Sequence, residues 1–418
     1  MRGVIVVLLI ASGCGDNRSA AVDAGVVVDA VTEIGDAAVV CPAASSFPAL
    51  HRTMPAIPRQ TSGGVATSAW TVVTITVAGD PLADRLHAFG DALVASSWLK
   101  TVGTQFQLGP ATGMHLRDAP AIATPMSPRA VATYLEAYLA GRSDLPTGKV
   151  IYLLYGTAQD SFEGDFGYHT TFAHEQGHLD AAFAPIARPP FLMYPESDLD
   201  MMTWAASHEI IEAATDFDGT GYRYATPDPA WSGSIWASLQ GGPVEVADVC
   251  TAGRVVEGPY YYARVFANDS AICGGDPCLP ASAEHYFNVS APLDWYAAGA
   301  GEVIEIPVIG WSTVPMENWV VYPTRLYGDP TMCGGAYCPQ LTLTTPLGTG
   351  TGAPCTPLAA MNNGVAGTLR VEMPANATSG EYHVISLLSF VEGAGPNGCN
   401  APDGEDYYHP WEVGVYVP

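Results

Sequence analysis

The segment Ser197–Asp216 carries the residues best suited to do chemistry in this 418-residue chain. It reads Ser-Asp-Leu-Asp-Met-Met-Thr-Trp-Ala-Ala-Ser-His-Glu-Ile-Ile-Glu-Ala-Ala-Thr-Asp. At about 100° per helical residue, His208 and Glu212 lie one turn apart on the same face, and Glu209 lies beside them. Imidazole nitrogen and carboxylate oxygen are ligands that zinc takes in proteins. The pattern predicts that His208 and Glu212 bind Zn²⁺, with Glu209 as the general base that acts on a water molecule.

The neighbours of these residues are apolar, among them Met201, Trp204 and Ile211. Burying an imidazole and several carboxylates on such a face is costly unless a cation or hydrogen bonds compensate. Asp216, one turn further along, is placed to orient a ligand rather than to bind the ion itself. The competing interpretation is a surface helix with its His and Glu side chains in solvent.

A second zinc-type pattern lies upstream, in His174-Glu175-Gln176-Gly177-His178. In that scheme His174 and His178 bind the ion, and Glu212 arrives from the later helix as the third ligand. Gly177 inside the motif argues against a helix there, so coincidence is the preferred explanation. In a third scheme a histidine reaches the same ion from a loop, and then His169 in Gly-Tyr-His-Thr is as eligible as His174.

Several segments predict the elements that must position these residues. A β-branched run over Trp70–Val77 predicts a strand, and a helical pattern follows from Leu82 to Leu99. A second helix is expected from Ser127 to Gly141, with Pro128 at its first position, before a strand over Val150–Tyr155. Ser197 and Asp200 can form a capping box for the site helix, which Gly219 ends. This order predicts an α/β domain over residues 66–279.

Beyond about residue 280 the sequence changes to short alternating runs separated by turn residues. This texture predicts an all-β, sandwich-like (Ig-like) domain over residues 280–418. The clearest runs are Val303–Val308, Trp319–Tyr322, Gly367–Met373 and Tyr382–Leu388.

The N-terminus predicts export and a lipid anchor. Met1-Arg2 precedes an apolar run, and Ala11-Ser12-Gly13-Cys14 places small residues before a cysteine, as in a lipoprotein signal over residues 1–14. Residues 15–65 are rich in Ala, Val and Asp and predict a low-complexity tether. We therefore expect a membrane-anchored lipoprotein of the outer membrane or cell surface, held through lipid on Cys14.

Charge and cysteine content fit that location. Lys and Arg total 16 against 42 Asp and Glu, a formal charge of -26, so nucleic-acid binding is not expected. An even number of cysteines in an oxidising compartment favours disulfides, although the sequence does not fix their pairing. The cysteines after Cys14 are Cys41, Cys250, Cys273, Cys278, Cys333, Cys338, Cys355 and Cys399.

Two segments together resemble a known family. The first is Ser207-His-Glu-Ile-Ile-Glu-Ala-Ala-Thr-Asp216, and the second is Val244-Glu-Val-Ala-Asp-Val-Cys250. They are similar to the SHExxEAxTDP helix and EIGDxC segment of bacterial secreted proteins that are described as zinc-metallopeptidase-like. Those proteins are distantly related to plant phosphate-induced (EXORDIUM-like) proteins. The resemblance covers roughly residues 66 to 275 and implies a zincin-like α+β core for this domain.

The resemblance implies a site made of His208, Glu209, Glu212 and Asp216 together with Glu245 and Asp248, and we take Asp248 as the third metal ligand. The chain departs from the family in having Phe217 where the family has proline, and in an insertion over Tyr224–Leu239. The plant relatives look to lack the His-Glu pair, so the fold does not require this chemistry.

The sequence thus predicts a secreted, lipid-anchored zinc peptidase that cleaves a protein or peptide substrate. The alternative is a non-catalytic cell-surface or matrix-binding lipoprotein with a degenerate or structural metal site. The sequence fixes neither the substrate nor the oligomeric state.

Overall fold

The computed structural model describes most of the chain from residue 64 onward, together with residue 57. The signal with Cys14, the motif His174–His178 and the cap residue Ser197 lie outside the described residues, as does the predicted tether apart from residues 57, 64 and 65. The described residues are 57, 64–122, 125–158, 161–163, 167–172, 181–188, 198–224, 244–250, 254–273, 276–280, 287–292, 295–312, 319–325, 339–351, 359–390 and 408–418.

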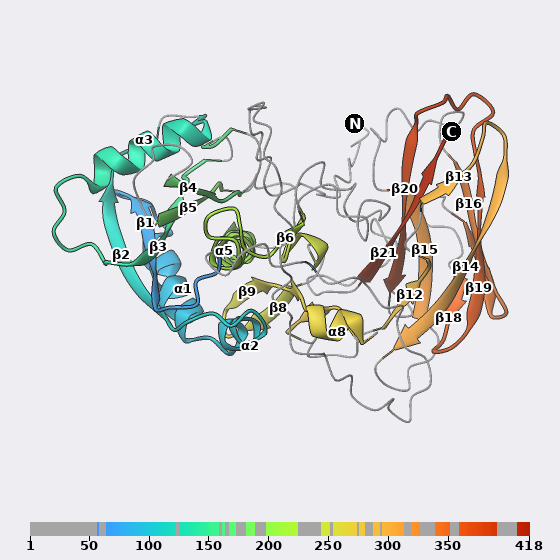
Figure 1. The fold of residues 1–418 in the computed structure, drawn as a ribbon, viewed down its shortest axis with the longest axis horizontal. Coiled ribbons are helices and arrows are strands. Elements are labelled where there is room, and N and C mark those ends of the chain that lie inside the picture. Colours follow the sequence, from blue (N-terminus) through green and yellow to red (C-terminus); the bar gives the residue numbers. More distant parts are fainter. Residues whose placement is uncertain are drawn as a thin grey trace, which may run out of the picture.

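One five-stranded sheet organises the N-terminal half of the described chain (Figure 1). Its order is β2-β1-β3-β5-β4, and β1 pairs in parallel with both β2 and β3. β5 runs parallel to β3, whereas β4 runs antiparallel beside β5 as the last strand. The strands are β1 (Trp70–Val77), β2 (Ala111–Ala119), β3 (Lys149–Tyr155), β4 (Thr170–Thr171) and β5 (Ala181–Ile186).

Helices cover both faces of this sheet (Figure 1). Side chains alternate along β3, so Ile151 and Leu153 enter one apolar core while Tyr152 and Leu154 enter another. The first core contains α1 and α5, and the second contains α3. This arrangement confirms the mixed α/β content that the sequence predicts. The helices are α1 (Ala83–Ala95), α2 (Ser97–Gln105), α3 (Pro128–Leu139), α5 (Asp198–Thr215) and α8 (Asn268–Ile272).

Helix α3 and strand β1 lie where the sequence predicts them. The prediction of a single helix from Leu82 to Leu99 is wrong. This segment is divided at Ser96, whose backbone is extended at φ -66° and ψ 152°. The hydroxyl of Ser96 accepts a hydrogen bond from the N–H of Leu99 and thereby starts α2. A serine can either lie inside a helix or cap the start of a new one through its side-chain hydroxyl. The apolar periodicity is the same in both cases, so it does not distinguish them.

Helix α5 lies in the first apolar core and is buried along almost its whole length. Its C-terminal end fits closely against backbone, since a Cβ on Gly221 would lie 1.9 Å from the carbonyl oxygen of Thr215. Among the described residues, no helix combines the length and apolar composition of a membrane span.

Short elements after α5 surround it. A disulfide joins Cys250 to Cys278, which confirms disulfide formation for this pair. In this region β6 pairs with β7, β8 with β9 and β10 with β11, all antiparallel. The elements are β6 (Arg223–Tyr224), β7 (Val244–Glu245), the 3₁₀ helix η1 (Asp248–Cys250), β8 (Arg254–Glu257), β9 (Tyr260–Ala263), β10 (Val265–Phe266) and β11 (Cys278–Leu279).

Two residues within the predicted tether already belong to the folded part. Ile57 is 1% exposed, and its backbone exchanges hydrogen bonds with the side chain of Asn268. Val65 is also 1% exposed. Ordered packing thus begins upstream of residue 66.

Two further five-stranded sheets make up the C-terminal part (Figure 1). Their orders are β12-β14-β19-β16-β17 and β13-β21-β20-β15-β18, and all neighbours pair antiparallel except β13 with β21. Apolar residues of both sheets, such as Leu343 and Val413, share one core. The strands are β12 (Phe287–Ser290), β13 (Trp295–Ala297), β14 (Val303–Ser312), β15 (Trp319–Arg325), β16 (Gln340–Thr345), β17 (Gly348–Thr351), β18 (Ala359–Met361), β19 (Ala366–Glu372), β20 (Tyr382–Phe390) and β21 (Tyr408–Tyr416).

Candidate metal centre

Helix α5 carries three titratable side chains into the interior, and His208, Glu209 and Glu212 are all 0% exposed. Two hydroxyls fix the helix against β9. Thr203 accepts a hydrogen bond from the N–H of Tyr261, and Ser207 accepts one from the N–H of Ala263. The helix is therefore held in one rotation about its axis, with His208 and its neighbours facing inward.

His208, Glu212 and Asp248 form a first group, in which one ligand atom from each residue lies within 4.8 Å of the other two. Nε2 of His208 is 3.2 Å from Oε1 of Glu212 and 3.6 Å from Oδ1 of Asp248. These are the three residues that the sequence nominates as metal ligands. The structure brings all three together, although Asp248 is 36 residues beyond Glu212 in the chain.

The turn that presents Asp248 is tied to α5 by backbone hydrogen bonds. Oε1 of Glu212 accepts bonds from the N–H of Ala247 at 3.2 Å and from that of Asp248 at 3.1 Å. Oδ2 of Asp248 accepts a further bond from the N–H of Glu245. Two residues on, the Cys250–Cys278 disulfide fastens the end of η1 to β11. Asp248, the predicted third ligand, is thus positioned by the tertiary structure and not by α5 alone.

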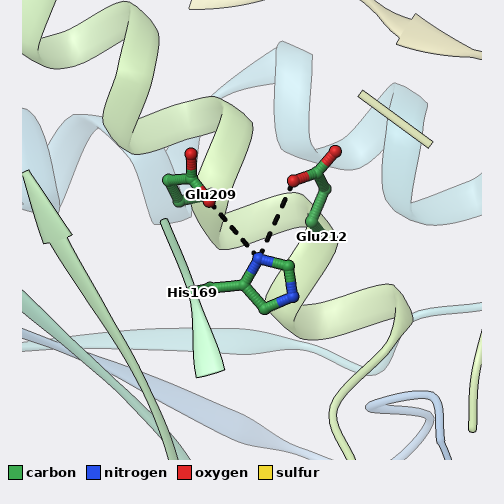
Figure 2. A group of neighbouring side chains, drawn as sticks. All are labelled: His169, Glu209 and Glu212. Carbon is green, nitrogen blue, oxygen red and sulfur yellow. Dashed lines mark hydrogen bonds and ion pairs between the residues drawn. The ribbon is translucent and has the colours of Figure 1, made fainter. Parts of the chain in front are cut away.

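His169 forms a second group with Glu209 and Glu212, from the segment just before β4 (Figure 2). Its Nδ1–H donates to Oε2 of Glu209 at 3.3 Å and lies 3.7 Å from Oε2 of Glu212. The imidazole is 6% exposed. Gly167 permits this approach, since a Cβ there would lie 3.2 Å from Oε1 of Glu209. The alternative ligand His169 therefore belongs to the cluster, whereas His174 and His178 lie outside the described residues.

Glu245 completes the surroundings of His169 on the opposite side of the ring. Its Oε2 is 3.3 Å from Nε2 of His169. The family resemblance implies that Glu245 belongs to the site but predicts no partner for it. From the sequence, His169 is predicted only as an alternative ligand from a loop. Their pairing joins residues far apart in the chain, so no local pattern signals it.

Asp216, predicted to orient a ligand, contacts other groups. It accepts a hydrogen bond from the N–H of Gly221 and lies 3.5 Å from the guanidinium of Arg223. Both contacts are with residues that follow α5 in the chain.

The charges in this interior oppose one another strongly. Burial by itself lowers the pKa of His169, but Glu245, Glu209 and Glu212 outweigh burial and raise that pKa to about 10. The pKa of His208 is likewise raised well above its ordinary value, because Glu212 and Asp248 outweigh burial. Burial and the charge of Asp248 raise the pKa of Glu212 to about 7, and burial raises that of Glu245 well above its ordinary range.

Several buried polar atoms in the cluster have no hydrogen-bond partner. They are Oε1 of Glu209, Oε2 of Glu212 and both ring nitrogens of His208, of which Nε2 forms only ion pairs, with Glu212 and Asp248. An unsatisfied buried polar atom is costly, and a bound cation is one way to satisfy it. Nitrogen and carboxylate oxygen donors at this spacing suit a divalent cation such as Zn²⁺. The residues present therefore fit the metal that the sequence predicts.

Comparison with known proteins finds no family model that matches the chain, and no curated protein that matches it. Solved structures that are similar in part include a family 123 glycoside hydrolase from Clostridium perfringens, at 12% identity and a TM-score of 0.17, over 29% of this chain and 22% of that one. A conjugate transposon protein from Bacteroides vulgatus gives 11% identity and a TM-score of 0.20, over 34% of this chain and 91% of that one. A β-glucosidase from Listeria innocua gives 9% identity and a TM-score of 0.17, over 88% of this chain and 48% of that one. Likenesses this weak carry no argument about fold or function.

Proposed function

We propose that the chain is an exported, lipid-anchored, zinc-dependent peptidase with a zincin-like core, whose zinc is held by His208, Glu212 and Asp248. One observation carries the proposal. Three buried side chains of suitable type, from α5 and η1, each offer a ligand atom within 4.8 Å of the others. A zinc ion held there would supply the chemistry of a peptidase by lowering the pKa of a water molecule and polarising the scissile carbonyl.

The chain's own residues have distinct roles in this proposal. Glu209, one residue from His208 and on the adjacent face of α5, is the general base that takes a proton from water and passes it to the leaving amine. Its Oε1 has no hydrogen-bond partner and is free to accept that proton. The backbone N–H groups of Ala247 and Asp248 hold the carboxylate of Glu212 in place.

One observation favours the alternative of a structural metal site in a non-catalytic surface protein. His208, Glu209 and Glu212 are all 0% exposed, as is usual for a closed site that only stabilises the fold. In that case the metal is retained and no peptide bond is cleaved.

Hydrolysis of a fluorescently labelled, denatured protein by the zinc-loaded full chain tests the proposal. We expect cleavage that is lost with a chelator, restored by Zn²⁺ and reduced at least about 100-fold in Glu209→Gln, in keeping with general-base catalysis. The matched control is Glu136→Gln on α3, outside the cluster, which should cleave normally. Equal cleavage by Glu209→Gln and the wild-type chain contradicts the catalytic role, whereas retained zinc without any cleavage supports the structural alternative.

A further inference from the structure

We propose that the cluster is a two-cation centre, in which a second divalent cation binds between His169, Glu209 and Glu212, and Glu212 bridges it to the first. The inference rests on the proposed function for the first cation site and adds a second site to it. It follows from the direction of individual ligand atoms, and not from the number of acidic residues.

The two oxygens of Glu212 face the two groups separately. Oε1 lies 3.2 Å from Nε2 of His208, in the first group. Oε2 lies 3.7 Å from Nδ1 of His169, in the second group, and has no hydrogen-bond partner although the residue is 0% exposed. A carboxylate with one oxygen toward each of two ligand groups is placed to bridge a pair of cations, as in hydrolases that use two ions about 4 Å apart.

His169 is held as a metal-binding histidine usually is. Its Nε2 is 3.3 Å from Oε2 of Glu245, while Nδ1 points to Glu209 and Glu212 (Figure 2). Histidine ligands commonly donate their second ring N–H to a carboxylate, which fixes the tautomer and turns the lone pair of the other nitrogen toward the ion. Glu245 fits this role, and it leaves Nδ1 as the nitrogen that binds the cation.

The donor set indicates the kind of cation. One imidazole nitrogen and carboxylate oxygens suit Zn²⁺ or Mn²⁺ rather than a soft ion such as Cu⁺. In this arrangement Oε2 of Glu209 is the ligand, and Oε1, which has no hydrogen-bond partner, still serves as the base.

Metal content of the full chain tests the inference. The wild-type chain and two variants are loaded with Zn²⁺, freed of excess ion by gel filtration and analysed by mass spectrometry for zinc per chain. The variants are His169→Ala and the matched control His115→Ala, whose histidine pairs with Asp91 outside the cluster. We expect two zinc ions in the wild-type chain and in His115→Ala, and one in His169→Ala.

Each alternative result identifies which proposal fails. One zinc ion in both the wild-type chain and His169→Ala overturns the two-cation centre and leaves the first site standing. No zinc in the wild-type chain overturns the zinc peptidase itself, and with it this inference.

A diffraction measurement keeps the inference testable if His169→Ala does not fold. Anomalous scattering from zinc-loaded wild-type crystals should give two peaks, one among His208, Glu212 and Asp248 and one beside Nδ1 of His169. A single peak in the first group counts against the second cation.

Discussion

The α/β region and the C-terminal pair of sheets fill their interiors with different side chains. Among the described residues, both groups of His, Asp and Glu close enough to hold a cation lie in the α/β region. The C-terminal sheets also bury polar residues, among them Glu412 and the neutral pair in which Ser389 donates to Asn288.

This difference follows from how the two interiors are assembled. In the C-terminal part, side chains alternate between the two faces of each strand, so the buried face of β16 presents Leu341, Leu343 and Thr345 in succession. In the α/β region, a buried helix meets a strand edge and a 3₁₀ turn, and these bring side chains from three directions to one place. Among the described residues, both groups that could hold a cation lie where these elements converge.

Replacing one buried glutamate in each region gives the sharpest test of this comparison. Glu212→Gln should weaken zinc binding more than about 100-fold, because Glu212 faces both groups. Losing a group that only supports a metal ligand weakens binding by at most about 100-fold. Glu412→Gln, at an equally buried position in β21, should leave zinc affinity unchanged. Competition with a zinc-binding dye measures both, and equal affinities in the two variants would contradict the assignment of the site.

An apolar truncation in the C-terminal sheets should have the opposite consequence. Trp319 in β15 is 0% exposed and packs against Phe287, so Trp319→Ala should lower the free energy of unfolding by about 3–5 kcal/mol. Zinc content below the unfolding transition should remain that of the wild-type chain. Urea unfolding with parallel metal analysis tests this, with the 41% exposed Val303→Ala as the control for a surface position. Loss of zinc from folded Trp319→Ala would show that the two regions are coupled.

The Cys250–Cys278 disulfide beside η1 should contribute both to the stability of the α/β region and to zinc binding at the proposed site. Removing it in Cys250→Ala/Cys278→Ala should cost about 3–4 kcal/mol, the chain-entropy value for a loop of this length, and should also weaken zinc binding because Asp248 is two residues away. Urea unfolding and the dye competition measure the two effects. A variant that is destabilised but binds zinc as tightly as the wild-type chain would show that the backbone hydrogen bonds to Glu212 suffice to place Asp248.

Acid should destabilise the α/β region through His87 on α1. Burial, helped by His115 and Arg117, lowers the pKa of His87 from 6.5 to about 4. The unfolded chain therefore takes up a proton below about pH 6.5 that the folded chain accepts only near pH 4. The contribution of neutral His87 to the free energy of unfolding is fully present above pH 6.5. It is lost as the pH falls toward 4, by up to about 3 kcal/mol.

The control for this effect is His87→Leu, which lacks the titrating group. Its hydroxyl partner Thr76 loses a hydrogen bond, so the variant is less stable at neutral pH, but its stability should vary less between pH 7 and pH 4. Urea unfolding at several pH values in the presence of a chelator measures the slopes. Equal slopes in the two chains would contradict the role of His87.

Much of the architecture could be predicted from local pattern. The predictions that hold rest on a β-branched run for β1, a proline at the first helical position for α3, and alternating apolar residues for β14 and β19. β2 and β5 were not predicted. The sequence of β2, Ala-Thr-Gly-Met-His-Leu-Arg-Asp-Ala, has neither strict alternation nor an apolar run, and its place is decided by pairing with β1.

The sequence by itself determined that His208 and Glu212 share a helix face, because a helix repeats about every 3.6 residues whatever surrounds it. Resemblance supplied Asp248, and His169 was one of several eligible histidines. Only the tertiary structure decided that His169 faces Glu209 and Glu212 with Glu245 behind it, and that Asp248 meets His208. These contacts join segments far apart in the chain. Their geometry depends on how β4, η1 and α5 pack together, and no local periodicity encodes that packing.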